Sequence, residues 1–191
     1  APRHHGAMKH VGPTRTELGT RTIFNLLGPL SNPTATKRQL VGVYDQKWCL
    51  PIAEVFGKLG AKHVWVVHGL DGMDELTISG PSFVACYNSG ELSSFEVTPE
   101  DANLKQKNIS DLRGGDAATN SKEILALLNG KQGAYQDIVV LNAAATLIVG
   151  GKAESLTEGA ELALQAINSR RAQQTLEKLI EISNRIVPEN K

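Results

Sequence analysis

The chain has little cysteine. Cys49 and Cys86 are its only two, and neither lies in a CxxC pair or beside clustered histidines. This scarcity argues against a disulfide framework and against a thiolate metal site, because both need several cysteines at suitable spacing. We therefore expect a protein of the reducing cytoplasm.

The chain also lacks a net charge and a long apolar run. Its 20 Lys and Arg residues balance its 20 Asp and Glu residues, so it has no global basic field to attract nucleic acid. The longest apolar stretch, residues 138–150, is interrupted by Asn142 and is shorter than the roughly 20 residues that a membrane span needs. The N-terminus lacks a signal-peptide pattern. We expect neither a nucleic acid nor a membrane as partner.

What is present is enough for one folded domain. The chain has 191 residues, of which 41% are hydrophobic and 21% charged, a balance typical of a globular domain with a single core. It lacks an initiator Met and opens inside a segment dense with basic and histidine residues. We interpret residues 1–191 as a single partial chain, the C-terminal part of something longer.

An alternation of strands and helices begins at residue 39. β-branched and apolar residues predict strands at 39–45 and 63–69, with a helix at 47–60 between them. A strand, a helix and a second strand form a parallel crossover unit. Residues 82–97 predict an antiparallel hairpin that turns at 88–90. These elements indicate an α/β fold.

Helices are predicted on both sides of this region. On the N-terminal side, Pro13 begins one helix that Gly19 ends, and a second covers residues 22–27 and stops at Gly28-Pro29, since proline disfavours helical geometry in the residue before it. The C-terminal helices are an Asn120- or Ser121-capped helix to Leu128, a buried helix around Asn142, a helix after a capping box at 155–158, and a last helix with Ala172, Leu176, Leu179 and Ile180 on one face.

Basic residues are concentrated at the N-terminal end. Residues 1–40 contain six Lys and Arg against the single acid Glu17, and they include three of the five histidines. Such a cluster is either a solvated face or an anion-binding edge.

The sequence HGLDGMDEL, residues 68–76, follows the second predicted strand and places two carboxylates side by side. Gly69 and Gly72 allow tight turns, Asp71 can close a turn with its own backbone, and Asp74 and Glu75 are left free. Ligand sites in open α/β sheets lie beyond the carboxyl ends of strands. Carboxylate oxygens suit Mg²⁺, which takes one or two of them together with water and substrate phosphate. The alternative is a polar surface turn.

Several blocks of sequence carry a family resemblance. AMKHVGPTRTELGTRTIFNLLGPLSNP, then QLVGVY, GLDGMDEL, GGDAATN and LNAAATLIVGG, occur in this order over nearly the whole chain. Together they resemble anthranilate phosphoribosyltransferases. The resemblance implies an α/β fold with a mixed, largely parallel β-sheet flanked by helices, of the nucleoside phosphorylase and phosphoribosyltransferase type. It also implies that an N-terminal helical domain is missing, so that residues 1–191 are the C-terminal α/β catalytic domain.

The resemblance further implies a reaction. Members of this family transfer the phosphoribosyl group of phosphoribosyl pyrophosphate to the amino group of anthranilate in tryptophan biosynthesis, and they release pyrophosphate with Mg²⁺ as the required cation. By this resemblance Asp74 and Glu75 hold Mg²⁺, and Arg15 contacts anthranilate. His5 lies near the same pocket, and Gly28 and Pro29 form a turn that lines it. No residue is expected to act as a catalytic acid or base.

Simpler roles stay open for these residues. Arg15 would otherwise be a solvated helix arginine, His5 a surface imidazole, and Gly28-Pro29 a helix terminator. The resemblance places a homodimer interface and a glycine-rich pyrophosphate loop upstream of this region, so we expect residues 1–191 alone to be inactive. The alternatives are a pyrimidine nucleoside phosphorylase-like enzyme and a non-catalytic binding relative of the same fold.

Overall fold

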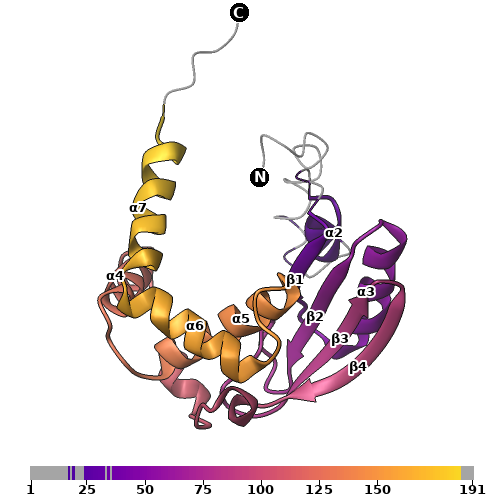
Figure 1. The fold of residues 1–191 in the computed structure, drawn as a ribbon, viewed down its shortest axis with the longest axis horizontal. Helices are drawn as coiled ribbons and strands as arrows, with labels where there is room; N and C mark the ends of the chain where they lie inside the picture. The colour runs from indigo at the N-terminus through magenta and orange to yellow at the C-terminus, as the bar shows by residue number, and fades with distance from the viewer. Residues whose placement is uncertain (1–16, 18, 20–23, 33, 35, 186–191) are drawn as a thin grey trace, which may run out of the picture.

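A four-stranded sheet lies between helices in the computed structural model, which describes residues 17, 19, 24–32, 34 and 36–185 (Figure 1). The strands follow the order β1 (Arg38–Gly42), β2 (His63–Gly69), β3 (Ser82–Asn88) and β4 (Glu91–Val97). The helices are α2 (Phe24–Leu30), α3 (Cys49–Lys58), α4 (Ala117–Leu128), α5 (Ala134–Val149), α6 (Leu156–Asn168) and α7 (Arg171–Ser183). Short 3₁₀ turns are η1 (Gln46–Trp48), η2 (Pro99–Ala102) and η3 (Ile109–Leu112).

The sheet is mixed, as predicted, and its parallel part is the predicted crossover. β1 and β2 pair in parallel from Arg38 opposite His63 to Gly42 opposite Val67, with α3 between them in the chain. The hairpin is confirmed as well, because β3 and β4 pair antiparallel across a turn at Ser89 and Gly90. The expectation of a largely parallel sheet is wrong for the described strands. β2 also pairs antiparallel with β3, so only one of the three pairings is parallel.

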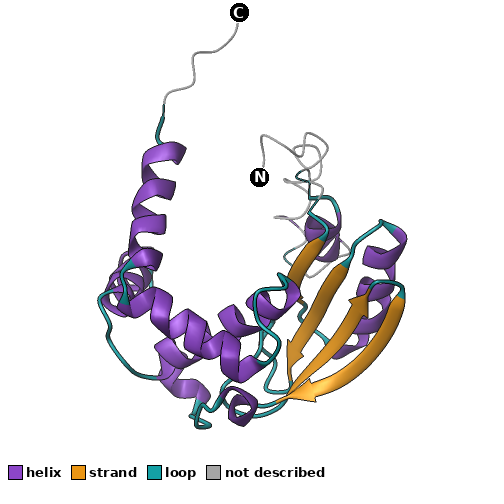
Figure 2. Ribbon diagram, viewed as in Figure 1, coloured by secondary structure: helices purple, strands orange, loops and turns teal. Residues whose placement is uncertain are grey.

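Strand β2 is buried on both faces, and its side chains alternate between two apolar clusters. Val64 and Val66 face the cluster that contains residues of α3, and Trp65 and Val67 face the cluster that contains residues of α5 and α6. Figure 2 shows α3 on one side of the sheet and the other long helices on the opposite side. A strand covered on both faces is expected to contain a nearly continuous apolar run, and residues 64–67 of β2 form such a run between His63 and His68.

The prediction that a helix stops at Gly28-Pro29 is wrong. Helix α2 runs through both residues to Leu30. Proline disfavours helical geometry in the residue before it through clashes with that residue's N–H and Cβ, and Gly28 has no Cβ. The Ser31 N–H then donates to the Leu27 carbonyl at 3.0 Å, which continues the helical bonding past Pro29.

Two helix starts differ in detail from the prediction. Helix α4 begins at Ala117 rather than after Asn120, because the Asp116 carboxylate accepts the Thr119 N–H at 2.8 Å. In α6 the predicted Ser155 cap is confirmed by its bond from the Glu158 N–H at 3.2 Å. The Glu158 carboxylate accepts the N–H of Glu154, one residue before the position that a capping box requires.

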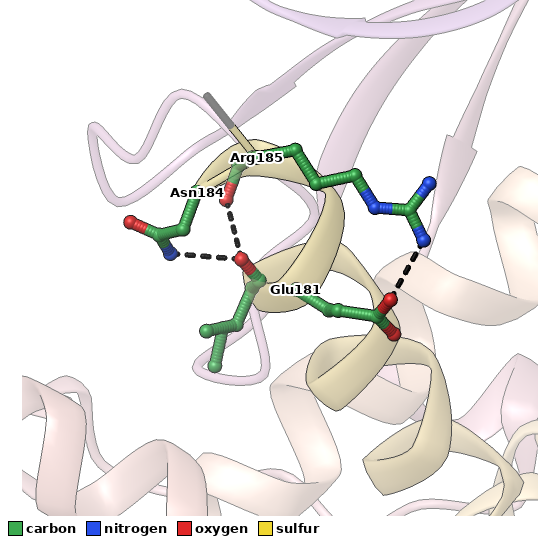
Figure 3. A network of polar contacts seen from close by, with 5 residues as sticks. Glu181, Asn184 and Arg185 are labelled. Atoms are coloured by element: carbon green, nitrogen blue, oxygen red, sulfur yellow. Dashed lines mark hydrogen bonds and ion pairs between the residues drawn. The ribbon is translucent and has the colours of Figure 1, made fainter. Parts of the chain in front are cut away.

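Helix α7 forms as predicted, with Ala172 and Leu176 of its apolar face half-buried, but the second part of that face is not covered by the described residues. Leu179 is 62% exposed and Ile180 52%, and α7 stands at the far end of the helical layer from the sheet (Figure 1). Local bonds close its last turn (Figure 3). Asn184 donates from its side chain to the Ile180 carbonyl at 2.8 Å, and Arg185 pairs with Glu181 at 2.6 Å. Such exposed pairs contribute little stability.

The helices of the described residues are all too short or too polar to cross a membrane.

The crossing of α5 and α6 depends on one glycine. A Cβ at Gly159 would lie 2.8 Å from the Ala144 Cα, which is closer than real Cβ contacts. We expect Gly159→Ala to destabilise the intact protein by about 1 to 3 kcal/mol through overpacking, measured by chemical denaturation. Gly80→Ala is the control, since its added Cβ would lie 3.8 Å from its nearest neighbour, an ordinary contact. Equal stability of the two variants would contradict this packing.

Candidate functional site

The acidic pair lies in the connection between β2 and β3, just beyond the carboxyl end of β2. Asp74 is exposed and Glu75 is half-buried, and the chain goes directly from Glu75 into the fully buried Leu76. Within the described residues, neither carboxylate has a hydrogen bond or an ion pair in the structure. The pair is therefore available to a ligand.

The end of strand β1 supports the backbone of this pair. A Cβ at Gly42 would lie 1.5 Å from the Asp74 carbonyl oxygen and 3.4 Å from the Glu75 nitrogen. Only a residue without a side chain fits there, because any Cβ would overlap the backbone of the acidic segment. Gly42 thus lets the acidic segment lie directly on the end of β1.

Helix α5 holds the residue that follows the pair. The Asn142 side-chain oxygen accepts the Leu76 N–H at 3.0 Å, and its amide donates to the Leu76 carbonyl at 2.8 Å. The same amide also donates to the Ile138 carbonyl at 3.0 Å. Both backbone groups of the buried Leu76 are satisfied in this way, as buried polar groups usually are. The helix therefore fixes the position of Glu75 from its C-terminal side.

Asp71 accepts hydrogen bonds from other residues of the same connection between β2 and β3. Its Oδ1 accepts the Met73 N–H at 3.1 Å, the predicted turn. Its Oδ2 accepts the Thr77 hydroxyl at 2.5 Å and the Ser79 hydroxyl. Gly69 leaves room for this arrangement, because a Cβ there would lie 2.7 Å from the Asp71 Oδ1.

The surroundings shift the pKa values of Glu75 and Asp71 in opposite directions. Burial raises the pKa of Glu75, and the neighbouring charges of Asp74 and Asp71 raise it further. Burial would also raise the pKa of Asp71, but the hydrogen bonds from Ser79, Thr77 and Met73 outweigh it and lower that pKa below its usual value. Glu75 thus sits in an excess of negative charge that a cation would relieve.

The donor set at this position suits Mg²⁺ and does not suit a structural metal. No group of three or more His, Cys, Asp or Glu residues in the described part of the chain is arranged to hold a metal ion. Mg²⁺ needs no such group, because it binds through one or two carboxylates and completes its shell with water and phosphate oxygens. Asp74 and Glu75 would be the two protein ligands.

Of the other predicted site residues, the structure describes only Gly28 and Pro29. Gly28 and Pro29 lie in α2, where they are helical rather than a turn, and a Cβ at Gly28 would meet no atom within 4 Å. His5 and Arg15 lie outside the described residues.

Sequence reasoning missed two supporting residues, although each carried a signal. Gly42 interrupts a β-branched strand, which often marks a close approach of another backbone. Asn142 interrupts an apolar helix, and a polar side chain in such a place needs a hydrogen-bond partner. In both cases the partner was not apparent, because Asp74 and Leu76 are distant in sequence.

Comparison with known proteins assigns the chain to a family. The sequence model described as "Glycosyl transferase family, a/b domain" matches residues 1–173. The chain belongs to this family, in agreement with the mixed sheet and flanking helices.

Its relatives narrow this class and confirm the resemblance found in the sequence. An anthranilate phosphoribosyltransferase of Paramagnetospirillum magneticum is 59% identical over 185 residues, which cover 97% of this chain and 54% of the relative. One from Rhodopseudomonas palustris (strain BisA53) is 55% identical over 96% of this chain and 54% of the relative. The chain thus spans about half the length of these curated relatives.

Solved structures agree with the assignment made from these sequence relatives. An anthranilate phosphoribosyltransferase from Thermus thermophilus matches with a TM-score of 0.83 and 40% identity, over 91% of this chain and 51% of that one. The Saccharomyces cerevisiae enzyme in complex with PRPP and Mg matches with a TM-score of 0.83 and 25% identity, over 93% and 51%.

The contact between Gly42 and the acidic segment can be tested by adding one methyl group. Gly42→Ala forces the Asp74 backbone away from β1, so we expect the intact protein to lose about 1 to 3 kcal/mol or more of stability, measured by chemical denaturation. Gly80→Ala is the control in the same connection, because its nearest neighbour would be 3.8 Å away. Unchanged stability of Gly42→Ala would show that the two segments do not touch.

Proposed function

We propose that the intact protein carrying this chain is an anthranilate phosphoribosyltransferase. It transfers the phosphoribosyl group of phosphoribosyl pyrophosphate to the amino group of anthranilate, which yields N-(5-phosphoribosyl)anthranilate and pyrophosphate in tryptophan biosynthesis. The bond from the ribosyl C1 to pyrophosphate breaks, a bond from C1 to the amine nitrogen forms, and the amine loses a proton. Relatives of this name at 55–59% identity support the proposal.

The observation that carries the proposal is the unpaired carboxylate pair. Asp74 and Glu75 lie beyond the end of a buried strand, with β1, α5 and Asp71 holding their backbone. In the proposed reaction they hold Mg²⁺, which when bound neutralises charge that grows on the departing pyrophosphate. The amino group of anthranilate is already nucleophilic and uncharged at neutral pH, so positioning and charge compensation suffice and no acid or base residue is needed.

The anthranilate side of the site rests on the resemblance. Arg15 would bind the anthranilate carboxylate through paired hydrogen bonds and stack on the ring, which suits a planar guanidinium better than a lysine. His5 would lie near the same pocket. Gly28 and Pro29 would contribute to its wall from helix α2, in place of the turn expected from the sequence.

Assembly and location are part of the same proposal. We infer a homodimer formed through an N-terminal helical domain, by the resemblance to the family. We infer a cytoplasmic location from the biosynthetic reaction and from the free, buried state of Cys49 and Cys86.

Turnover of the intact protein tests the reaction. Mixed with phosphoribosyl pyrophosphate and Mg²⁺, it should consume anthranilate, which is followed by the loss of anthranilate fluorescence, and chelation of Mg²⁺ should stop the reaction. Turnover of thymidine with phosphate instead would indicate a nucleoside phosphorylase. Binding of anthranilate without turnover of either pair would indicate a binding protein.

The metal carboxylates are tested by removing their charges. We expect Asp74→Asn combined with Glu75→Gln to lower kcat by at least about a hundredfold, since charge compensation is the main contribution of the site, with partial rescue at high Mg²⁺. Asp111→Asn combined with Glu161→Gln removes the same two charges from exposed positions elsewhere and should leave the rate unchanged. An unaltered rate and Mg²⁺ dependence in the first variant would refute the assignment.

A further inference from the structure

Asp71 joins the two ends of the segment that carries the acidic pair. Residues 72–76 lie between Asp71 and Thr77, and the Thr77 hydroxyl donates to the Asp71 Oδ2 at 2.5 Å. The Ser79 hydroxyl donates to the same oxygen. Asp74 and Glu75 therefore lie within a short loop whose ends are tied to one carboxylate.

The hydrogen bonds continue from this carboxylate into the start of β3. The Thr77 hydroxyl accepts the Ser79 N–H at 3.0 Å, and the Thr77 N–H donates to the buried Ser82 hydroxyl at 2.9 Å. Thr77 is 1% exposed and Ser82 is fully buried. The loop is thus anchored to the sheet through side chains that solvent does not reach.

The position requires a carboxylate. Its donors are the Met73 N–H on one oxygen and two hydroxyls on the other, and an ionised carboxylate accepts at both oxygens. An amide has a single accepting oxygen, so Asn cannot receive all three donors in the same geometry. The lowered pKa of Asp71, in which hydrogen bonds outweigh burial, agrees with an ionised group at neutral pH.

We propose that Asp71 is a positioning residue for the metal site: through Thr77 and Ser79 it holds residues 72–76 in the bend that presents Asp74 and Glu75 to one cation. This inference rests on the proposed function. Adjacent side chains of an extended segment point to opposite sides, so two neighbouring carboxylates share an ion only if the backbone between them is bent and kept bent. Residues that orient metal ligands in this way typically contribute 10- to 100-fold in metal affinity.

A second explanation has to be separated from this one. Asp71 is also a negative charge near Glu75, and its loss would weaken cation binding by electrostatics alone. Thr77→Val and Ser79→Ala remove neutral donors and leave the Asp71 charge in place. Asp71→Glu keeps the charge but moves the carboxylate by one methylene. Positioning predicts impairment in all three variants, whereas a pure charge effect predicts none.

The first measurement is amide hydrogen exchange of the intact protein, which does not depend on activity. In Asp71→Asn, Thr77→Val and Ser79→Ala we expect exchange in a peptide covering residues 70–79 to accelerate roughly tenfold through local opening. A peptide from α3 should be unaffected. Ser79→Ala removes a half-buried hydroxyl, so it tests the inference even if loss of the buried Thr77 hydroxyl unfolds the protein.

The second measurement is the Mg²⁺ concentration that gives half the maximal transferase rate. It should rise about tenfold or more in the same variants and in Asp71→Glu, with kcat at saturating Mg²⁺ largely kept. The matched control is Asp101→Asn. Asp101 likewise accepts a backbone N–H and a hydroxyl, both from Thr98 and both on Oδ2, at 2.7 and 3.2 Å. A single amide oxygen can accept both, so this variant removes only a negative charge outside the loop and should leave both measurements unchanged.

Three outcomes would overturn the inference. They are unchanged exchange in Asp71→Asn and Ser79→Ala, a normal Mg²⁺ requirement in Ser79→Ala and Asp71→Glu, and an equal effect of Asp101→Asn. Failure of the wild-type protein to show Mg²⁺-dependent transfer would instead refute the proposed function, and the exchange measurement would still decide whether Asp71 holds the loop.

Discussion

The approach of the Asp74 backbone to Gly42 is the constraint on which the rest of the site depends. It brings the connection after β2 onto the end of the neighbouring parallel strand, so that the acidic residues lie over the rim of the sheet. Once the backbone is there, Asn142 fixes it on the side of α5 and Asp71 fixes it within the loop. Three independent supports therefore hold one short segment.

This degree of support has an electrostatic reason. Asp71, Asp74 and Glu75 place three carboxylates within five residues, and the two other charges raise the pKa of Glu75 in addition to burial. Repulsion between such groups would extend a free loop. Asp71 accepts from uncharged donors, and Leu76 exchanges hydrogen bonds with the uncharged Asn142 amide, so these bonds hold the backbone without neutralising the acidic pair. The site keeps its negative charge for a cation because its supports are neutral.

The parts of the fold that the sequence predicted are those in which the pattern is local. The β1–α3–β2 unit and the β3–β4 hairpin follow from apolar periodicity and turn residues within short stretches. The wrong predictions concern places where an adjacent residue or an adjacent strand determines the structure. Helix α2 passes through Pro29 because Gly28 lacks a Cβ, and the sheet is less parallel than expected because β3 returns beside β2.

The residues of the candidate site also fall into those that a local sequence pattern reveals and those that it does not. Asp74 and Glu75 could be singled out from residue type and from their place after a strand, but that pattern also fitted a polar surface turn, and their proposed metal role came from the resemblance. The supports of the site could not be singled out, because the bond from Leu76 to Asn142 joins residues 66 apart in the chain, and no local pattern reveals such a partner. His5 and Arg15 were predicted from the resemblance alone and lie outside the described residues.

The length of the connection between β2 and β3 supports a functional interpretation of this region. Antiparallel neighbours can be joined by a two-residue turn, and β3 and β4 are joined in this way by Ser89 and Gly90. β2 and β3 are also antiparallel neighbours, yet their connection runs over residues 70–81. The topology does not require this length.

The additional chain first reaches back over β1, then exposes the acidic pair and finally buries Leu76, Thr77 and Ile78 before β3 begins. Burial of the second half provides the anchorage that the exposed first half lacks, which is why a charged loop at the rim of the sheet can be ordered before any cation binds.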